Sequence, residues 1–322
     1  MTGRRKQHII TNCIKRNFVL FMMVMAFHVS AQAQTDPIFT QYMNSIQTVN
    51  PAYAGMWEKV GVQVFTRQYY VGHSGAPLTK SVSFYSPVKN ENNGIGLNIV
   101  DDRIGYEKKL TVTADYAYQV RLDWKTYLRM GLKAGFINYD NLLTQYQLYP
   151  DGIDDPQFME DVHINFMVSW GIGAMVYSKD YYVSFSIPQI IQNDFQANRN
   201  NYSSLAELRY AYLIGGYIFG QQRQIRFKPS FMLKGAIGAP IQADVSANFL
   251  FYNKFWLGAM YRTNNTVAAV MQLVVLKNLR LGYAVDYSIS QEFRKYQLGT
   301  HEIRLIYEYD FYKRPYTKRR YF

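Results

Sequence analysis

The stretch Leu279-Arg280-Leu281-Gly282-Tyr283-Ala284-Val285-Asp286-Tyr287 decides the fold. Every odd position carries a large apolar side chain, and every even position carries a charged or very small one. Because a strand places alternate residues on opposite faces, this pattern predicts a β-strand with one apolar and one charged face. Such a strand suits a soluble sheet that buries its apolar face, or an outer-membrane barrel that turns that face to lipid.

The same alternation recurs along the chain after a segment without periodicity. It is clear in 108–122, 224–234 and 242–252, where the residues between the apolar positions are mostly polar or charged. We expect strands at 59–70, 80–86, 94–100, 108–122, 126–139, 163–177, 181–187, 205–219, 224–234, 242–252, 255–262, 266–276, 279–287 and 301–309.

The connections between these strands alternate in length. Tight turns such as Asn253-Lys254 follow the even-numbered strands, and longer links such as 101–107, 140–162 and 288–300 follow the odd-numbered ones, with shorter exceptions at 235–241 and 263–265. Outer-membrane barrels have short periplasmic turns and long outer loops. No amphipathic helix is apparent to cover so many apolar faces. The sequence therefore predicts an all-β fold, a transmembrane antiparallel up-and-down barrel of about 14 strands.

The first 33 residues are expected to be a signal peptide. A basic opening is followed by a short apolar run at 18–27 and by Ala31 and Ala33, the small residues that a signal peptidase requires. Cys13, the only cysteine, is expected to leave with this leader. We divide the chain into a signal peptide (1–33), a lead-in segment (34–58), a barrel (59–312) and a basic periplasmic tail (313–322), and expect both mature termini in the periplasm.

The lead-in segment has two prolines and several aromatic residues, which imply docking. We expect it either in the lumen, where it would act as a plug, or at the periplasmic rim; an irregular tail before the first strand is the alternative. The candidate partner or plug residues are Asp36, Pro37, Phe39, Gln41, Tyr42, Asn50, Pro51 and Tyr53.

The inward faces of the predicted strands are rich in charge. These side chains form either an ion-pair ladder that fills the barrel or the lining of a solute channel whose selectivity they set. We expect a lumen filled by the lead-in segment. The candidate lumen charges are Arg67, Asp115, Arg129, Lys133, Arg226, Lys228, Lys234, Asp244, Arg280, Asp286, Glu302 and Arg304.

Other function classes find little support. The histidines outside the leader, His73, His163 and His301, have no Cys or His at metal-ligand spacing, so we expect no metal or cofactor. A hydrolase using His301, Glu302 and a serine such as Ser288 lacks a local signature, so we expect no catalytic residues. The net charge is +12, of which five positive charges lie in the leader; the other Lys and Arg are spread along strands without a basic helix or finger motif, so we expect no nucleic-acid partner.

The link 140–162 is acidic in an otherwise basic protein. It is either a patch for a basic partner or a divalent cation, or a loop that is simply solvated. It contains no Lys or Arg, and its acidic residues are Asp140, Asp151, Asp154, Asp155, Glu160 and Asp161.

The lead-in blocks Asp36-Pro-Ile-Phe-Thr-Gln-Tyr-Met43 and Asn50-Pro-Ala-Tyr-Ala-Gly55 resemble the N-terminal signature of the PorP/SprF family, outer-membrane proteins of the type IX secretion system in Bacteroidetes. The resemblance spans essentially the whole mature chain. Later blocks follow in the family's order: Gly75-Ala-Pro77, Lys228-Pro-Ser230, Gly238-Ala-Pro240 through Asp244, Trp256-Leu-Gly258 with Tyr261-Arg262, Gly282-Tyr283-Ala284 with Asp286-Tyr287, and His301-Glu302-Ile303.

This resemblance implies a barrel without enzymatic activity that helps to deliver or hold secreted proteins at the cell surface. The implied partners are periplasmic ring and peptidoglycan-linked components, secreted cargo or a surface adhesin, and membrane lipid. Two branches stay open, a general secretion component and a helper of one large adhesin, as in gliding motility; a compact chain without an extra domain leans to the first. The alternative function is an outer-membrane channel or transporter for small solutes.

Overall fold

The computed structural model describes residues 39–44, 46–56, 59–88, 92–146, 158–192, 194–196, 204–206, 208–220, 223–289 and 298–310. The predicted signal peptide and basic tail lie outside these residues and stay predictions. The chain divides into two compact units, and the barrel described below belongs to the unit of residues 34–237 and 241–322. No helix in the described ranges is long and apolar enough to span a membrane.

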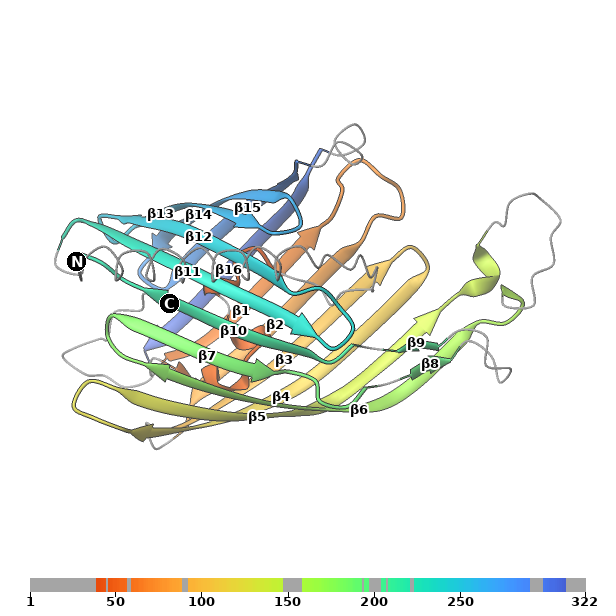
Figure 1. Cartoon of the computed structure of the whole chain (residues 1–322), viewed down its shortest axis with the longest axis horizontal. Coiled ribbons are helices and arrows are strands. Elements are labelled where there is room, and N and C mark those ends of the chain that lie inside the picture. Colours follow the sequence, from red (N-terminus) through yellow and green to blue (C-terminus); the bar gives the residue numbers. More distant parts are fainter. Residues whose placement is uncertain are drawn as a thin grey trace, which may run out of the picture. The chain divides into compact units, whose positions relative to one another are not determined.

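Fourteen strands close into an antiparallel barrel, and β1 pairs with β16 to complete the ring (Figure 1). This confirms the predicted fold class. The strands are β1 (Lys59–Gln68), β2 (Leu78–Pro87), β3 (Asn93–Ile104), β4 (Glu107–Arg121), β5 (Tyr127–Asn141), β6 (Val162–Tyr177), β7 (Tyr181–Ile187), β10 (Tyr210–Tyr217), β11 (Ile225–Ala236), β12 (Gln242–Phe251), β13 (Phe255–Arg262), β14 (Thr266–Leu276), β15 (Leu279–Ser288) and β16 (Thr300–Asp310).

Short elements complete the described chain. Two strands outside the ring, β8 (Asp194–Gln196) and β9 (Ser204–Ala206), pair only with each other. Three 3-10 turns precede β1, namely η1 (Tyr42–Asn44), η2 (Ile46–Thr48) and η3 (Pro51–Tyr53), and η5 (Leu143–Gln145) follows β5.

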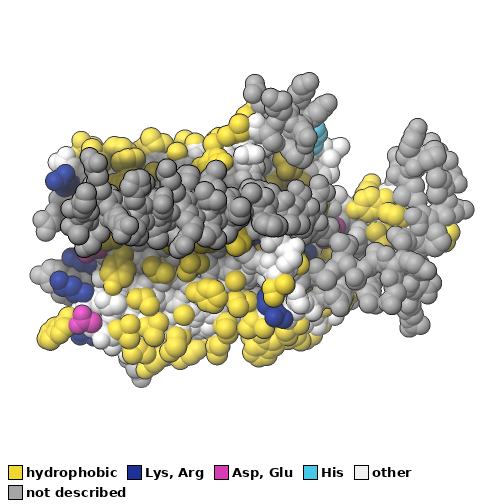
Figure 2. All heavy atoms as spheres, viewed as in Figure 1, with side chains coloured by type: hydrophobic (Ala, Val, Ile, Leu, Met, Phe, Trp, Pro, Cys, Tyr) yellow, Lys and Arg dark blue, Asp and Glu magenta, His cyan; other side chains and the backbone are white. Residues whose placement is uncertain are grey.

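The alternation in β15 behaves as predicted. Gly282, Ala284 and Asp286 are buried inside, whereas Leu281 and Tyr287 are exposed on the outer face. The other strands repeat this pattern, so apolar side chains spread over the outer surface and most of the charged ones in view lie near the strand ends (Figure 2). A continuous apolar surface of this kind is unfavourable in water and is typical of the lipid-facing band of an outer-membrane barrel.

The connections at the two ends of the barrel differ, as expected. The turns at 88–92, 122–126, 178–180, 218–224, 252–254 and 277–278 all lie at one end, which we call the turn end. The other end carries the links 69–77, 142–161, 188–209 and 289–299 together with shorter ones, and we call it the loop end.

Two boundaries differ from the prediction. The link expected at 101–107 is a tight hairpin at Gly105-Tyr106, because β3 and β4 continue pairing and place Asp102 opposite Lys109. The strand expected at 205–219 is divided into β9 and β10. Because β7 ends at Ile187, it can pair with β10 only over Tyr212–Tyr217, and the residues before Tyr210 have no partner strand within the described barrel.

Candidate functional site in the barrel lumen

The lead-in segment lies inside the barrel along its described residues, 39–44 and 46–56. Side chains of this segment, including Thr40, Met43 and Ile46, are completely buried. Its contacts reach strands on all sides of the ring, among them β1, β6, β11 and β16, which only a segment inside the ring can do. In Figure 1 it is the orange coil enclosed by the strands.

The local sequence explains the shape of the last part of this segment. Asn50 precedes η3 with an extended backbone, and its side-chain oxygen accepts a hydrogen bond of 2.9 Å from the Ala52 amide. Pro51 occupies the first position of the turn, where its missing N–H costs nothing. The motif Asn50-Pro51-Ala52-Tyr53 is therefore a capped turn that shortens the chain within the lumen.

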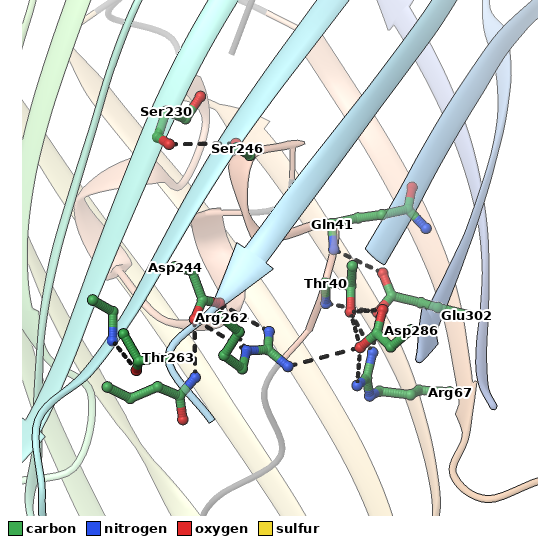
Figure 3. A network of polar contacts seen from close by, with 12 residues as sticks. Thr40, Gln41, Arg67, Ser230, Asp244, Ser246, Arg262, Thr263, Asp286 and Glu302 are labelled. Atoms are coloured by element: carbon green, nitrogen blue, oxygen red, sulfur yellow. Dashed lines mark hydrogen bonds and ion pairs between the residues drawn. The ribbon is translucent and has the colours of Figure 1, made fainter. Parts of the chain in front are cut away.

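A buried ionic network holds the first described residues of the lead-in segment (Figure 3). The Glu302 carboxylate accepts the backbone N–H groups of Thr40 and Gln41 at 2.7 and 2.9 Å. Arg67 pairs with Glu302 at 2.8 Å and with Asp286 at 2.6 Å, and it donates to the Thr40 hydroxyl. That hydroxyl donates in turn to Asp286.

A second cation extends this network. Arg262 pairs with Asp244 at 2.9 Å and approaches Asp286 at 3.7 Å, so it lies between the two carboxylates (Figure 3). The three carboxylates of the whole network, Asp244, Asp286 and Glu302, and its two arginines are almost fully buried. Buried charges of opposite sign persist only when they are paired and hydrogen-bonded, and this network meets that condition.

Charged and polar groups of the wall also bind the backbone of the lead-in segment. Lys228 donates to the Met43 carbonyl at 2.9 Å, and Arg129 donates to the carbonyls of Ala52 and Ala54 at 2.9 and 2.5 Å. The lead-in segment reciprocates, because the Asn50 amide donates to the carbonyls of Ala174 and Phe185 at 3.3 Å. The contacts of Lys228 and Arg129 satisfy carbonyls of the lead-in segment, which lie outside the strand ladder.

Glycines on the inward faces leave room for this backbone. Gly131 on β5 and Gly173 on β6 are direct neighbours in the register. A Cβ at Gly131 would collide with the backbone of Pro51 and Ala52, and one at Gly173 would collide with the Asn50 side chain. The two glycines thus form a niche for the capped turn, which explains why small residues alternate with apolar ones here.

Replacing Gly131 by valine is expected to lower the free energy of unfolding by about 1–3 kcal/mol, because the added carbons meet backbone atoms that cannot rotate away. The matched control is Gly235→Val on β11, where the atom nearest to an added Cβ belongs to the Ile241 side chain, at 3.7 Å. Chemical denaturation in detergent measures both. Equal effects of the two substitutions would contradict the niche.

An apolar cluster completes the packing in the lumen. Tyr42, Met43 and Ile46 of the lead-in segment are buried together with wall residues such as Tyr182 and Trp256. The lead-in segment is therefore packed like a core element and also held by charges.

Most of the predicted site residues meet in the lumen. Of the plug candidates, Phe39, Gln41, Tyr42, Asn50, Pro51 and Tyr53 are buried there, and Asp36 and Pro37 lie outside the described residues. The lumen charges Arg67, Asp115, Arg129, Lys133, Arg226, Lys228, Lys234, Asp244, Asp286, Glu302 and Arg304 are buried, and Arg280 is partly exposed and pairs with Glu308 at 3.0 Å.

Three members of these networks were not among the predicted site residues. Arg262 and Glu308 continue the alternation of β13 and β16, so the same pattern could have identified both as inward charges. Thr40 lies in a segment without periodicity, and no sequence signal distinguishes it from its neighbours.

The remaining candidates do not assemble into a chemical site. His301 lies near the Tyr283 hydroxyl, at 2.5 Å, on the face of β16 opposite the buried Glu302. The part of the chain that the structure describes contains no group of three metal-ligating side chains. In the acidic link, hydrogen bonds from the Thr144 amide and hydroxyl lower the pKa of Asp161. Residues 147–157 of that link, which include Asp151, Asp154 and Asp155, lie outside the described residues.

A family model described as type IX secretion system membrane protein PorP/SprF matches residues 31–307. No curated protein sequence matches the chain. Among solved structures, Omp33 of Acinetobacter baumannii is 7% identical, covering 80% of this chain and 100% of its own, with a TM-score of 0.45. A mutant of TodX, a monoaromatic hydrocarbon channel, is 9% identical, covering 83% of this chain and 94% of its own, with a TM-score of 0.49.

Proposed function

The chain belongs to the PorP/SprF family of type IX secretion system membrane proteins, and from this membership we propose that it is an outer-membrane component that supports secretion or cell-surface attachment of cargo proteins. It acts through contacts with the periplasmic machinery and with cargo. The family match over residues 31–307 is the observation that carries the proposal.

The filled lumen supports a role based on contacts. The lead-in segment is buried along most of its described length, and charges from β1, β11, β15 and β16 bind it. A wide solute path would need this volume free. The surfaces left for function are then the turn end and the loop end, which in an outer membrane face the periplasm and the cell surface respectively.

The partners proposed for these surfaces differ in location. The turn end, where β16 ends at Asp310, is the face for periplasmic ring and peptidoglycan-linked components, and we place the C-terminal end on this side. The loop end is the face for secreted cargo or a surface adhesin. Membrane lipid contacts the apolar band between them. Within the family we favour a general secretion component over an adhesin-specific helper, a preference that rests on the compact barrel of the described residues.

Purification of the tagged protein from outer membranes tests this proposal. We expect type IX periplasmic components or secreted cargo to copurify with it, and not with an unrelated outer-membrane barrel that carries the same tag. The alternative function, a channel or transporter for small solutes, predicts a different outcome. Recovery of no secretion component, together with solute-selective conductance of the purified protein, would contradict the proposal.

A further inference from the structure

The end of the lead-in segment lies at the turn end of the barrel. Gly55 packs so closely on Ser86 and Gly94 that a Cβ would collide with their backbones, and these two residues border the turn at 88–92. The Ala54 carbonyl accepts from Arg129, the third residue of β5 after the turn at 122–126. From here the chain enters β1 at Lys59, also at the turn end.

The beginning of the described lead-in segment lies toward the opposite end. Thr40 is bound by Glu302, the third residue of β16, and by Arg67, the last but one residue of β1. It also contacts Asp286, the third residue from the end of β15. All three strands meet the loop end at these positions. The Phe39 ring packs edge-on against Phe65 of β1 with the centroids 4.4 Å apart.

The chain therefore descends through the lumen from the loop end to the turn end before β1 ascends again. The contacts in between lie nearer the turn end: Lys228, which binds Met43, is the fourth residue of β11, and Ala174, which accepts from Asn50, is the fourth residue from the end of β6. The direction rests on the contacts of Thr40 at the loop end and of Ala54 and Gly55 at the turn end.

A short N-terminal extension cannot reverse this direction. If the leader is removed after Ala33, five residues precede Phe39, and these span at most about 18 Å when fully extended. Ten residues of β1 rise about 33 Å along the strand, which is about 25 Å along the axis of a barrel whose strands tilt by about 40°. The lumen on the way back is already occupied by the lead-in segment.

We infer that the N-terminal end of the mature chain opens at the loop end, on the same face as the long links, and thus on the cell surface of an outer-membrane barrel. This replaces the periplasmic N-terminus expected from the sequence. It goes beyond the proposed function, because it places the N-terminal end at the loop end and leaves the C-terminal end at the turn end. Residues before Phe39 are then available to secreted proteins, and the C-terminal end to periplasmic machinery.

Single-cysteine labelling on intact cells tests this inference. The sole natural cysteine, Cys13, lies in the predicted leader, so an added cysteine would be the only one in the mature protein. Asp36→Cys is the test variant. Asn264→Cys, exposed in the loop-end link 263–265, and Lys125→Cys, exposed at the turn end, are the matched controls. A bulky maleimide that does not cross the outer membrane is the probe.

We expect Asp36→Cys to be labelled on intact cells as fast as Asn264→Cys, whereas Lys125→Cys reacts only after the outer membrane is permeabilised. If Asp36→Cys, like Lys125→Cys, is labelled only after the outer membrane is permeabilised, the inference is wrong. Protection of Asp36→Cys in both intact and permeabilised cells, with reaction only after denaturation, would also overturn it, because it would place the end inside the lumen. Each result is independent of which secretion partners are found.

Discussion

Replacing Arg67 by methionine is expected to lower the free energy of unfolding by about 3–5 kcal/mol, the usual cost of removing one partner from a buried ionic network. Arg67 is the shared cation of Asp286 and Glu302, at 2.6 and 2.8 Å, and all three side chains are almost fully buried. Without it the two carboxylates repel each other in a buried site, and among the described residues Arg262, at 3.7 Å from Asp286, is the one cation that still pairs with either of them.

A second substitution separates loss of charge balance from loss of packing. Adding Glu302→Gln to Arg67→Met removes one of the two carboxylates, so we expect it to restore part of the lost stability. The matched control is Arg103→Met, because Arg103 pairs with Asp101 at 2.9 Å but its side chain is half exposed, which predicts an effect below about 1 kcal/mol.

Denaturant titration of the barrel in detergent micelles, followed by tryptophan fluorescence, gives these free energies. An Arg67→Met effect no larger than that of Arg103→Met would contradict a structural role for the network. So would a double variant that is less stable than Arg67→Met alone.

The barrel was predictable because its signal is local. Alternation in a stretch such as 279–287 fixes which side chains point inward without any knowledge of the partner strand. The predicted strand boundaries were wrong where pairing with a neighbouring strand determines them. The short β7 limits how far β10 can be paired, and continued pairing across the β3–β4 hairpin extends both strands into the expected loop.

The lumen was predictable only in part. Alternation shows which side chains of a strand point inward. It does not show at which position along the barrel axis two inward charges from different strands meet. Arg67 and Glu302 are opposite each other in the β1–β16 register, and Asp286 joins them from β15. This register across the closing strands cannot be read from either strand alone.

The path of the lead-in segment was less predictable still. The wall holds it largely by binding backbone groups, as Glu302, Lys228 and Arg129 do. Almost every residue offers the same backbone groups, so binding through the backbone leaves no recognisable pattern in the side chains of the lead-in segment. The one local signal was the capped turn Asn50-Pro51-Ala52, whose shape is set by its own sequence.

We propose that the barrel is closed by its own lead-in segment and works by contact with other proteins. Conductance in planar bilayers tests it most directly, with three purified proteins: the wild type, a variant lacking residues 39–56, and a control lacking residues 313–322. Heat-dependent mobility on gels first establishes that each barrel is folded.

We expect the wild type and the variant without 313–322 to show no steady conductance, because both proteins keep the lead-in segment in the lumen. The variant without 39–56 is expected to open a large and steady current, since its lumen loses the segment that Glu302, Arg129 and Lys228 bind. A large, steady conductance from the wild-type protein, equal to that of the variant lacking 39–56, would contradict a lumen closed by the lead-in segment.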